Sequence, residues 1–361
     1  MDEDKRYALA LARIKGLRRA PLFRLLKEFT PAALFKLALS GGAGAAADPV
    51  VRAVKGFREW EWVDRELEFA EKKGARIITF NDPDYPQAFK EICDPPLLLY
   101  ARGDIGLCNS ALTVAVVGTR RPSHYGLKMA ETVSSDLAAA GVAVVSGMAR
   151  GCDAAAHRGA LRAGGATVAV LGTGVDIAYP KENVRLYEEV SERGLLLSEY
   201  PMTTPPKPFN FPKRNRLISG MSRGVLVVEA PLRSGAMMTA RLALDYNRDV
   251  FAVPGPATSY KSKGSNRLLK DGAGVVTEAA DIFDAFGLTP AENKTVQGEE
   301  AGIMDGEEAV VFKALGEEPV FIDEIIERTG LQPSSVSALL LQMELKGMVL
   351  QRPGKTFVRS F

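Results

Sequence analysis

The chain has 361 residues, of which 46% are hydrophobic and 25% are charged, and its formal net charge is +2. This profile is typical of a globular protein that is too long for one ordinary core, so two or three domains are expected. Because the positive and negative charges nearly balance, a surface that binds a polyanion has to gather its cations locally. The charge total excludes a uniformly basic protein.

Three cysteines (Cys93, Cys108 and Cys152) are widely spaced, and only two histidines occur. This pattern argues against a disulfide framework and against a metal centre, and it fits a reducing compartment. The first residues are charged and no long apolar run follows them, so we expect neither a signal peptide nor a membrane span. The sequence therefore predicts a cytoplasmic protein that needs no metal and no cofactor.

Residues 1–75 are expected to form a small, basic helical domain. Apolar residues from Leu22 to Phe29 repeat at helical spacing, and a longer helix is predicted over Glu59–Lys73. A turn is predicted at Lys15-Gly16-Leu17-Arg18, between the first two helical patterns.

Residues 76–286 are assigned to the central domain, in which short apolar runs alternate with helical patterns from about residue 110. Runs this apolar are typical of strands that are buried on both faces of a parallel sheet. Their alternation with helices predicts a doubly wound, Rossmann-like α/β fold with a mostly parallel sheet. The expected strands are Thr113–Val117, Val142–Val145, Thr167–Leu171, Leu195–Leu197, Val225–Val228 and Val250–Val253.

The last quarter of the chain is expected to be a separate domain. Residues 287–304 are polar and contain several glycines and a proline, which predicts a linker. Residues 305–361 contain three short helical patterns followed by two strands that meet at Pro353-Gly354. That order predicts a winged helix-turn-helix.

Glycine, small hydroxyl residues and basic residues follow the strands of the central domain. In an open parallel sheet, ligands bind beyond the carboxyl ends of the strands, and glycine lets backbone amides approach an anion there. A single turn of this kind is weak support, because every strand-to-helix connection needs a turn, but four on one edge favour anion binding. No dinucleotide or P-loop fingerprint accompanies them. The candidate residues in these turns are Gly118, Thr119, Arg120, Ser123, Gly147, Arg150, Lys181, Asn183, Ser234 and Gly235.

The densest basic cluster lies between Lys207 and Gly220. Cations neutralise the phosphates of a single strand, and aromatic rings stack on its bases for about 1–3 kcal/mol each. Phe209 or Phe211 is the candidate stacking residue, although ordinary packing explains two phenylalanines equally well. The candidate residues of this cluster are Lys207, Phe211, Lys213, Arg214, Asn215 and Arg216.

Taken together, these motifs resemble those of the DprA family, also called DNA processing or DNA-protecting protein A. The likeness follows the whole central domain in order. The matching runs include Val117–Arg120, Ser146–His157, Gly172–Asp176, Phe211–Gly220, Val228–Ala230 and Val253–Gly255.

The resemblance implies a dimeric bacterial protein that binds single-stranded DNA and loads the RecA recombinase onto it during natural transformation. It implies that Arg120 and the basic residues Lys181 and Lys207–Arg216 contact the DNA, and that the terminal domains are a SAM or helix-hairpin-helix-like domain and a winged helix. Thr119 departs from the serine or alanine usual in the family. The turn at Gly16 lacks the second glycine of the family's hairpin, which puts phosphate binding there in doubt.

Two other classes of function remain open. A nucleotide-processing enzyme resembling phosphoribohydrolases of the "lonely guy" type has the same kind of sheet, but the catalytic glutamate of that family has no counterpart after Ser234-Gly235, and only Glu229 remains as a candidate acid. A sequence-specific regulator would use the winged helix, whose candidate recognition helix carries mostly serine, glutamine and glutamate. We therefore expect a binding protein without catalytic activity.

Overall fold

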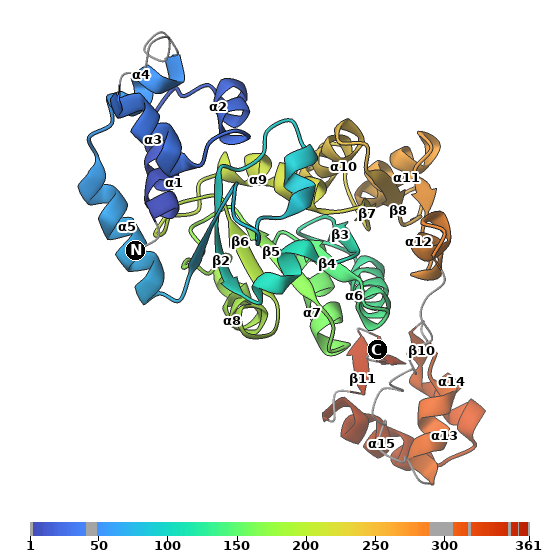
Figure 1. Ribbon diagram of the computed structural model, residues 1–361. Coiled ribbons are helices and arrows are strands. Elements are labelled where there is room, and N and C mark those ends of the chain that lie inside the picture. Colours follow the sequence, from blue (N-terminus) through green and yellow to red (C-terminus); the bar gives the residue numbers. More distant parts are fainter. Residues whose placement is uncertain are drawn as a thin grey trace. The chain divides into compact units, whose positions relative to one another are not determined.

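The computed structural model describes residues 3–40, 49–288, 306–316, 319–345, 348–352 and 354–359 (Figure 1). The chain divides into two compact units, Met1–Asn293 and Lys294–Phe361. The expected linker at 287–304 lies outside the described residues except for Gly287 and Leu288. Within the described parts of the chain, no helix combines the length and the apolar character that a membrane span requires.

The first unit is built on a nine-stranded sheet with the order β1-β2-β6-β5-β4-β3-β7-β8-β9. Strands β3 to β9 are all parallel, whereas β2 is antiparallel to both β1 and β6. Strands β1, β2 and β9 were not predicted from the sequence. The strands are β1 (Arg76–Thr79), β2 (Leu98–Gly103), β3 (Thr113–Val117), β4 (Ala143–Ser146), β5 (Thr167–Leu171), β6 (Leu195–Ser198), β7 (Gly224–Val227), β8 (Asp249–Ala252) and β9 (Gly274–Val275).

Helices cover both faces of this sheet, as its apolar strands predict. Along β3, Val114 and Val116 pack with α6, α7 and α12, while Ala115 and Val117 belong to the cluster that contains α9 and α10. This alternation buries both faces, and it confirms the doubly wound α/β class. The helices are α6 (His124–Ala139), α7 (Cys152–Arg162), α8 (Val184–Arg193), α9 (Asn210–Met221), α10 (Gly235–Asp245), α11 (Lys263–Lys270) and α12 (Ala280–Ala285).

The strand order reverses between β3 and β7. The chain runs from β3 through β4 and β5 to β6 on one side, and then crosses back to β7, β8 and β9 on the other side. In open α/β sheets, such a switch point leaves a crevice at the carboxyl ends of the two central strands. The loops after β3 and β7 therefore open into one crevice.

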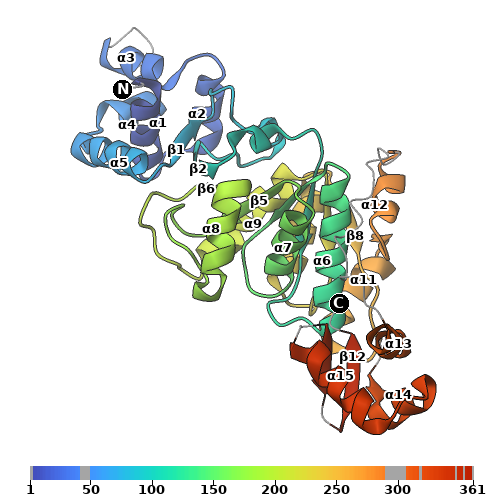
Figure 2. The ribbon, with the colours of Figure 1, turned by 90° about the horizontal axis from the view of Figure 1, so that it is seen from below.

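Five N-terminal helices pack beside β1 and β2 within the same unit (Figures 1 and 2). Leu9, Leu22 and Val63 share a hydrophobic cluster with Ile78 of β1 and Leu99 of β2. Shared apolar burial explains why the helical region and the sheet form one compact unit. The helices are α1 (Glu3–Arg13), α2 (Arg19–Leu26), α3 (Pro31–Ser40), α4 (Pro49–Lys55) and α5 (Trp60–Lys72).

The second unit is a small winged helix with a core of its own. Its sheet has the order β10-β12-β11, and Val311, Ile325, Leu340 and Val349 lie in its hydrophobic cluster. This arrangement confirms the winged helix-turn-helix predicted for residues 305–361. Its elements are α13 (Glu307–Ala314), β10 (Val320–Phe321), α14 (Ile322–Thr329), α15 (Pro333–Leu345), β11 (Val349–Arg352) and β12 (Thr356–Arg359).

Candidate nucleic-acid interface

Two adjoining cavities open at the carboxyl edge of the central sheet. The larger one, named here the switch-point cavity, has a volume of about 400 Å³ and lies between the loops after β3 and β7 and helix α9. Its lining includes Gly118, Thr119, Arg120, Ala149, Asp153, Phe211, Arg214, Asn215, Ser234 and Gly235. The switch point thus gathers eight of the sixteen candidate residues around one crevice.

The second cavity, named here the arginine cavity, has a volume of about 280 Å³. Three arginines contribute to its wall together with two aromatic rings. Its lining is Arg120, Arg121, Gly147, Ala149, Arg150, Tyr179, Pro180 and Phe211. Arg120, Ala149 and Phe211 line both cavities, so they form the wall between them.

The Phe211 ring is surrounded by two guanidinium groups and a second aromatic ring. The Arg120 guanidinium carbon lies 5.6 Å from its centre, the Arg214 guanidinium carbon 6.0 Å, and the Tyr179 ring 5.5 Å. The ring packs closely on Gly172, where an added Cβ would lie 2.9 Å from a ring carbon. These contacts fix the orientation of Phe211, which remains partly exposed to the cavities.

Four candidate cations are exposed: Arg120, which lines both cavities, and three lysines that are next in sequence to lining prolines, namely Lys181, Lys207 and Lys213. Among the described residues, none of the four forms an ion pair. The Lys213 ammonium lies 5.7 Å from the ring of Phe209, which is 58% exposed. Cations without a carboxylate partner can pair with an incoming anion without first losing an internal ion pair.

Arg150 is also exposed, but it forms an ion pair within the protein. Its guanidinium forms a 2.5 Å ion pair with the carboxylate of Glu182, and both side chains are more than half exposed. An exposed pair of this kind contributes little to stability, so either partner can exchange for another ion.

Arg214 was expected to contact phosphate, but its guanidinium is buried in the structure. Its Nη1 donates to the carbonyl of Gly147 at 2.8 Å and to the carbonyl of Val170. Burial lowers the pKa of Arg214 to about 10, and the negative charge of Asp153 acts in the opposite direction. The bonds join α9 to the ends of β4 and β5, so the largely buried Arg214 supports the wall of the switch-point cavity.

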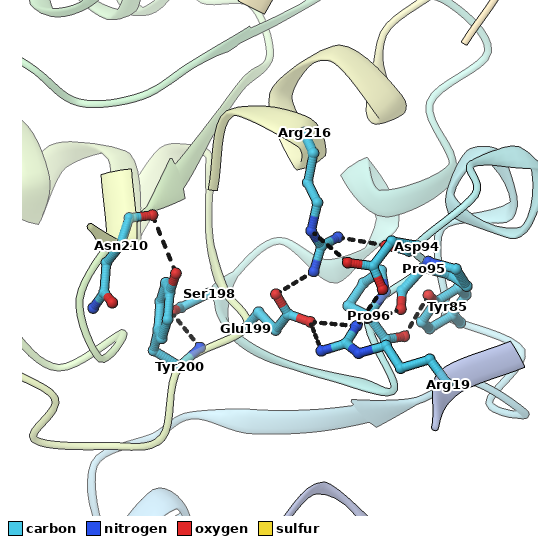
Figure 3. Close-up of polar contacts among 10 residues, drawn as sticks. All are labelled: Arg19, Tyr85, Asp94, Pro95, Pro96, Ser198, Glu199, Tyr200, Asn210 and Arg216. Carbon is cyan, nitrogen blue, oxygen red and sulfur yellow. Dashed lines mark hydrogen bonds and ion pairs between the residues drawn. The ribbon is translucent and has the colours of Figure 1, made fainter. Parts of the chain in front are cut away.

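Arg216 was also expected to contact phosphate, but it is paired with carboxylates in the structure. Its guanidinium bonds to the carboxylate of Glu199 and donates to the carbonyl of Asp94 at 2.7 Å, and its side chain is only 10% exposed (Figure 3). It lines neither cavity. A basic run on one helix spreads its side chains around the helix, and here Arg216 meets the nearby carboxylate of Glu199 and that of Asp94, which is 122 residues away.

Three further candidates hold the loops in place. The side chain of Asn183 donates to the carbonyl of Met148 at 2.9 Å, and that of Asn215 donates to the carbonyl of Gly235 at 3.3 Å. Ser123 caps α6 by accepting from the amide of Gly126. All three polar groups are thus engaged within the protein.

The amide of Thr119, expected from the sequence to be free for phosphate, donates to the carbonyl of Glu229 at 2.7 Å. The carboxylate of Glu229 accepts from Ser123, through the backbone N–H at 2.8 Å and the hydroxyl at 2.6 Å. Glu229 is 2% exposed. The remaining candidate for an acid catalyst therefore fastens the β3 loop to the β7 loop.

The imidazole of His157 and the thiol of Cys152, which are both potentially reactive groups, are buried as well. His157 accepts from the amide of Met148 at 3.3 Å, and its other ring nitrogen bonds to the hydroxyl of Thr167 at 2.7 Å. Burial lowers the pKa of His157 to about 3 and raises that of the Cys152 thiol to about 12. Both groups are neutral near pH 7 and serve packing.

Sequence reasoning did not assign Tyr179 and Arg121 to the site, although both line the arginine cavity. Tyr179 lies in the loop after β5. Its position beside Arg120 and Phe211 depends on the tertiary fold. Both residues stand close to candidates in the sequence, Arg121 directly after Arg120 and Tyr179 shortly before Lys181, and this proximity is the signal that the sequence offers.

The fold and the site together define a doubly wound α/β protein with a cationic, aromatic-lined sheet edge and a winged-helix unit. Residues 76–287 match the model of the DNA recombination-mediator protein A family, and residues 295–355 match that of the DprA winged helix domain. The chain therefore belongs to the DNA recombination-mediator protein A (DprA) family.

Individual relatives agree with this assignment. Protein Smf of Synechocystis sp. is 34% identical over 99% of both chains. The X-ray structure of DNA processing protein A from Streptococcus pneumoniae matches with a TM-score of 0.66 and 34% identity, covering 77% of this chain and 97% of that one. A Helicobacter pylori structure, which concerns the single-stranded DNA binding mode of its DNA processing protein A, matches with a TM-score of 0.54 and 34% identity over 58% of this chain and 95% of that one.

Proposed function

We propose that this protein binds single-stranded DNA along the carboxyl edge of its sheet. Phosphates pair with Arg120, Lys181, Lys207 and Lys213, and a base stacks on Phe211. The observation that carries the proposal is the shared wall of two cavities, which holds the exposed Arg120 beside the Phe211 ring, with further exposed cations next in sequence to lining residues.

The shape of the site favours a single strand over a duplex. Cavities of about 400 and 280 Å³ admit single nucleotide groups, and the Phe211 ring can stack only on a base that is not paired in a helix. The Helicobacter pylori relative, whose structure concerns single-stranded DNA binding, supports the same ligand class.

Most of the remaining candidate residues act within the protein in this proposal. Gly118, Gly147, Ser234 and Gly235 shape the loops, while Asn183, Asn215 and Ser123 hold them together. Arg214 and Arg216 are reassigned from phosphate contacts to structural support, because both are buried. Burial of Glu229 and His157 supports binding without catalysis.

We further propose that the protein acts as a homodimer that loads the RecA recombinase onto single-stranded DNA in natural transformation and recombination, within the cytoplasm. Membership of the recombination-mediator family supports this role. A mixture of RecA with single-stranded DNA should assemble filaments faster when the protein is added. An unchanged assembly rate would contradict the loading step but not DNA binding.

The deciding experiment compares single-stranded and duplex oligonucleotides in gel shifts at several salt concentrations. Wild type should prefer the single strand, and Arg120→Ala should weaken binding and reduce the salt slope by about 0.7, the value for one lost single-strand phosphate contact. Arg193→Ala is the control, since Arg193 lies at the end of α8 and pairs with Glu189. Equal affinity and slope for wild type and Arg120→Ala would overturn the site.

A further inference from the structure

The loop between β6 and α9, residues 199–209, carries Lys207 of the proposed DNA site and the exposed Phe209. We infer that the N-terminal helices position this loop, and that Glu199 and Glu66 are the positioning residues. The inference rests on the proposed function and assigns the helical region a mechanical role in DNA binding.

Glu199, the first residue of the loop, lies between two arginines from different parts of the chain (Figure 3). One carboxylate oxygen bonds to Arg216 on α9, and the other accepts from Arg19 on α2 at 3.2 Å. Arg19 also reaches the Asp94 carboxylate at 2.9 Å. Glu199 thereby links an N-terminal helix to the helix that carries Lys213.

Glu66 on α5 holds the same loop three residues further on. Its carboxylate accepts from the amide of Met202 at 2.7 Å, and the residue is only 8% exposed. The next residue, Thr203, has a φ of +58°, which a β-branched residue adopts only when its surroundings impose it. Its amide donates to the carboxylate of Asp176 at 2.8 Å. Two carboxylates therefore hold a strained turn in the loop.

The far end of the loop is fastened to the sheet. Tyr200 donates from its hydroxyl to the carbonyl of Asn210 at 3.1 Å, and the Asn210 side chain donates to the carbonyl of Gly172 at 3.0 Å. Lys207 and Phe209 are exposed between these fixed points. Their placement beside the switch-point cavity, which Pro208 lines, thus depends on anchors at both ends.

The direction in which DNA affinity changes when a carboxylate is removed distinguishes a positioning role from a purely electrostatic one. Removing a carboxylate near a cationic loop makes the region more positive, which by itself strengthens binding to a polyanion. Loss of the anchor lets the loop leave its bound-state geometry, which weakens binding. Glu199→Gln therefore gives opposite results under the two accounts.

The test measures the affinity of the full chain for a fluorescent single-stranded oligonucleotide by anisotropy. Glu199→Gln and Glu66→Leu should each weaken binding about tenfold, as expected when one partner of a buried polar pair is lost. Their salt slopes should match that of wild type, because no phosphate contact is removed. Glu66→Gln should bind like wild type, since its amide oxygen still accepts from Met202. Asp64→Asn is the control, because Asp64 pairs with Arg6 within the helical region.

Hydrogen exchange adds a readout that does not depend on DNA. Amides of residues 199–209 should exchange faster in Glu199→Gln and Glu66→Leu than in wild type. Equal or tighter DNA binding by both variants, or unchanged exchange in the loop, would overturn the positioning role. If Glu199→Gln does not fold, the comparison of Glu66→Leu with Glu66→Gln decides. Arg120→Ala is measured in parallel: if it too binds like wild type, the proposed DNA site fails, and the failure is not specific to the loop anchors.

Discussion

The guanidinium carbon of Arg120 lies 5.6 Å from the centre of the Phe211 ring, and the pair forms the wall between the switch-point and arginine cavities. A phosphate on Arg120 and a base on Phe211 would belong to the same or neighbouring nucleotides. The pair combines charge and stacking in one place, so the two contributions can be measured separately.

Phe211→Leu should weaken binding to single-stranded DNA by about 1–3 kcal/mol, because the stacking surface is lost. The salt slope should stay the same, since no charge changes. Phe211→Tyr keeps the ring and should bind like wild type. Anisotropy titrations at several salt concentrations check both points, and wild-type affinity in the leucine variant would remove Phe211 from the site.

Glu182→Gln should strengthen binding. The change frees Arg150 from its 2.5 Å ion pair, so that its guanidinium becomes available to a phosphate. Because the pair is exposed, the gain should be at most about fivefold. The salt slope should steepen as one phosphate contact is added. Glu189→Gln, which breaks the Arg193 pair on α8, serves as the matched control. Weaker binding by Glu182→Gln would show that the carboxylate supports the site.

Glu229→Gln should lower the free energy of unfolding by about 1–3 kcal/mol, because an amide cannot accept both hydrogen bonds from Ser123 in the buried site. Urea denaturation measures this change. Glu131→Gln is the control, since its ion pair with Arg162 is partly exposed and should contribute less than about 1 kcal/mol. Nucleotide hydrolysis by wild type that disappears in Glu229→Gln would instead favour the enzyme alternative.

His157 should make the folded state sensitive to acid. Its pKa is lowered to about 3 in the folded state, so between about pH 6.5 and 3 the unfolded chain binds a proton that the folded chain does not. Stability from this group is therefore present above pH 6.5 and is lost as the pH falls, by up to about 1.4 kcal/mol per pH unit.

Urea denaturation between pH 7 and 4 checks this effect as a difference between variants. His157→Gln should flatten the pH dependence relative to wild type, whereas His124→Gln, at an exposed position, should leave it unchanged. Parallel curves for wild type and His157→Gln would contradict the buried neutral state of this imidazole.

Much of the central domain was predictable from local patterns. The six expected strands from Thr113 to Val253 all formed, because continuous apolar runs between glycine-rich turns have few other stable arrangements than a doubly buried sheet. Strands β1, β2 and β9 were missed. The antiparallel strand β2 pairs with β6, which follows it by about a hundred residues, and β1 pairs with β2.

The sequence predicted which loops form the candidate site, but it did not predict which of their residues are exposed and which are held by internal contacts. Arg120, Lys213 and Arg216 are alike in a list of basic residues, yet the first two are exposed and the third is enclosed by Glu199 and Asp94. The number of cations in a segment follows from the sequence, whereas their partners follow from packing.

By itself, the sequence determined the doubly wound class, the winged-helix unit and the sheet edge at which the candidate residues gather, because periodicity and turn residues act over short distances. Only the tertiary structure decided which arginines remain available to an anion and which ones brace the loops. A basic side chain is available to an anion only if folding places no carboxylate or carbonyl beside it. Several of these neighbours, such as Asp94 beside Arg216, come from distant parts of the chain.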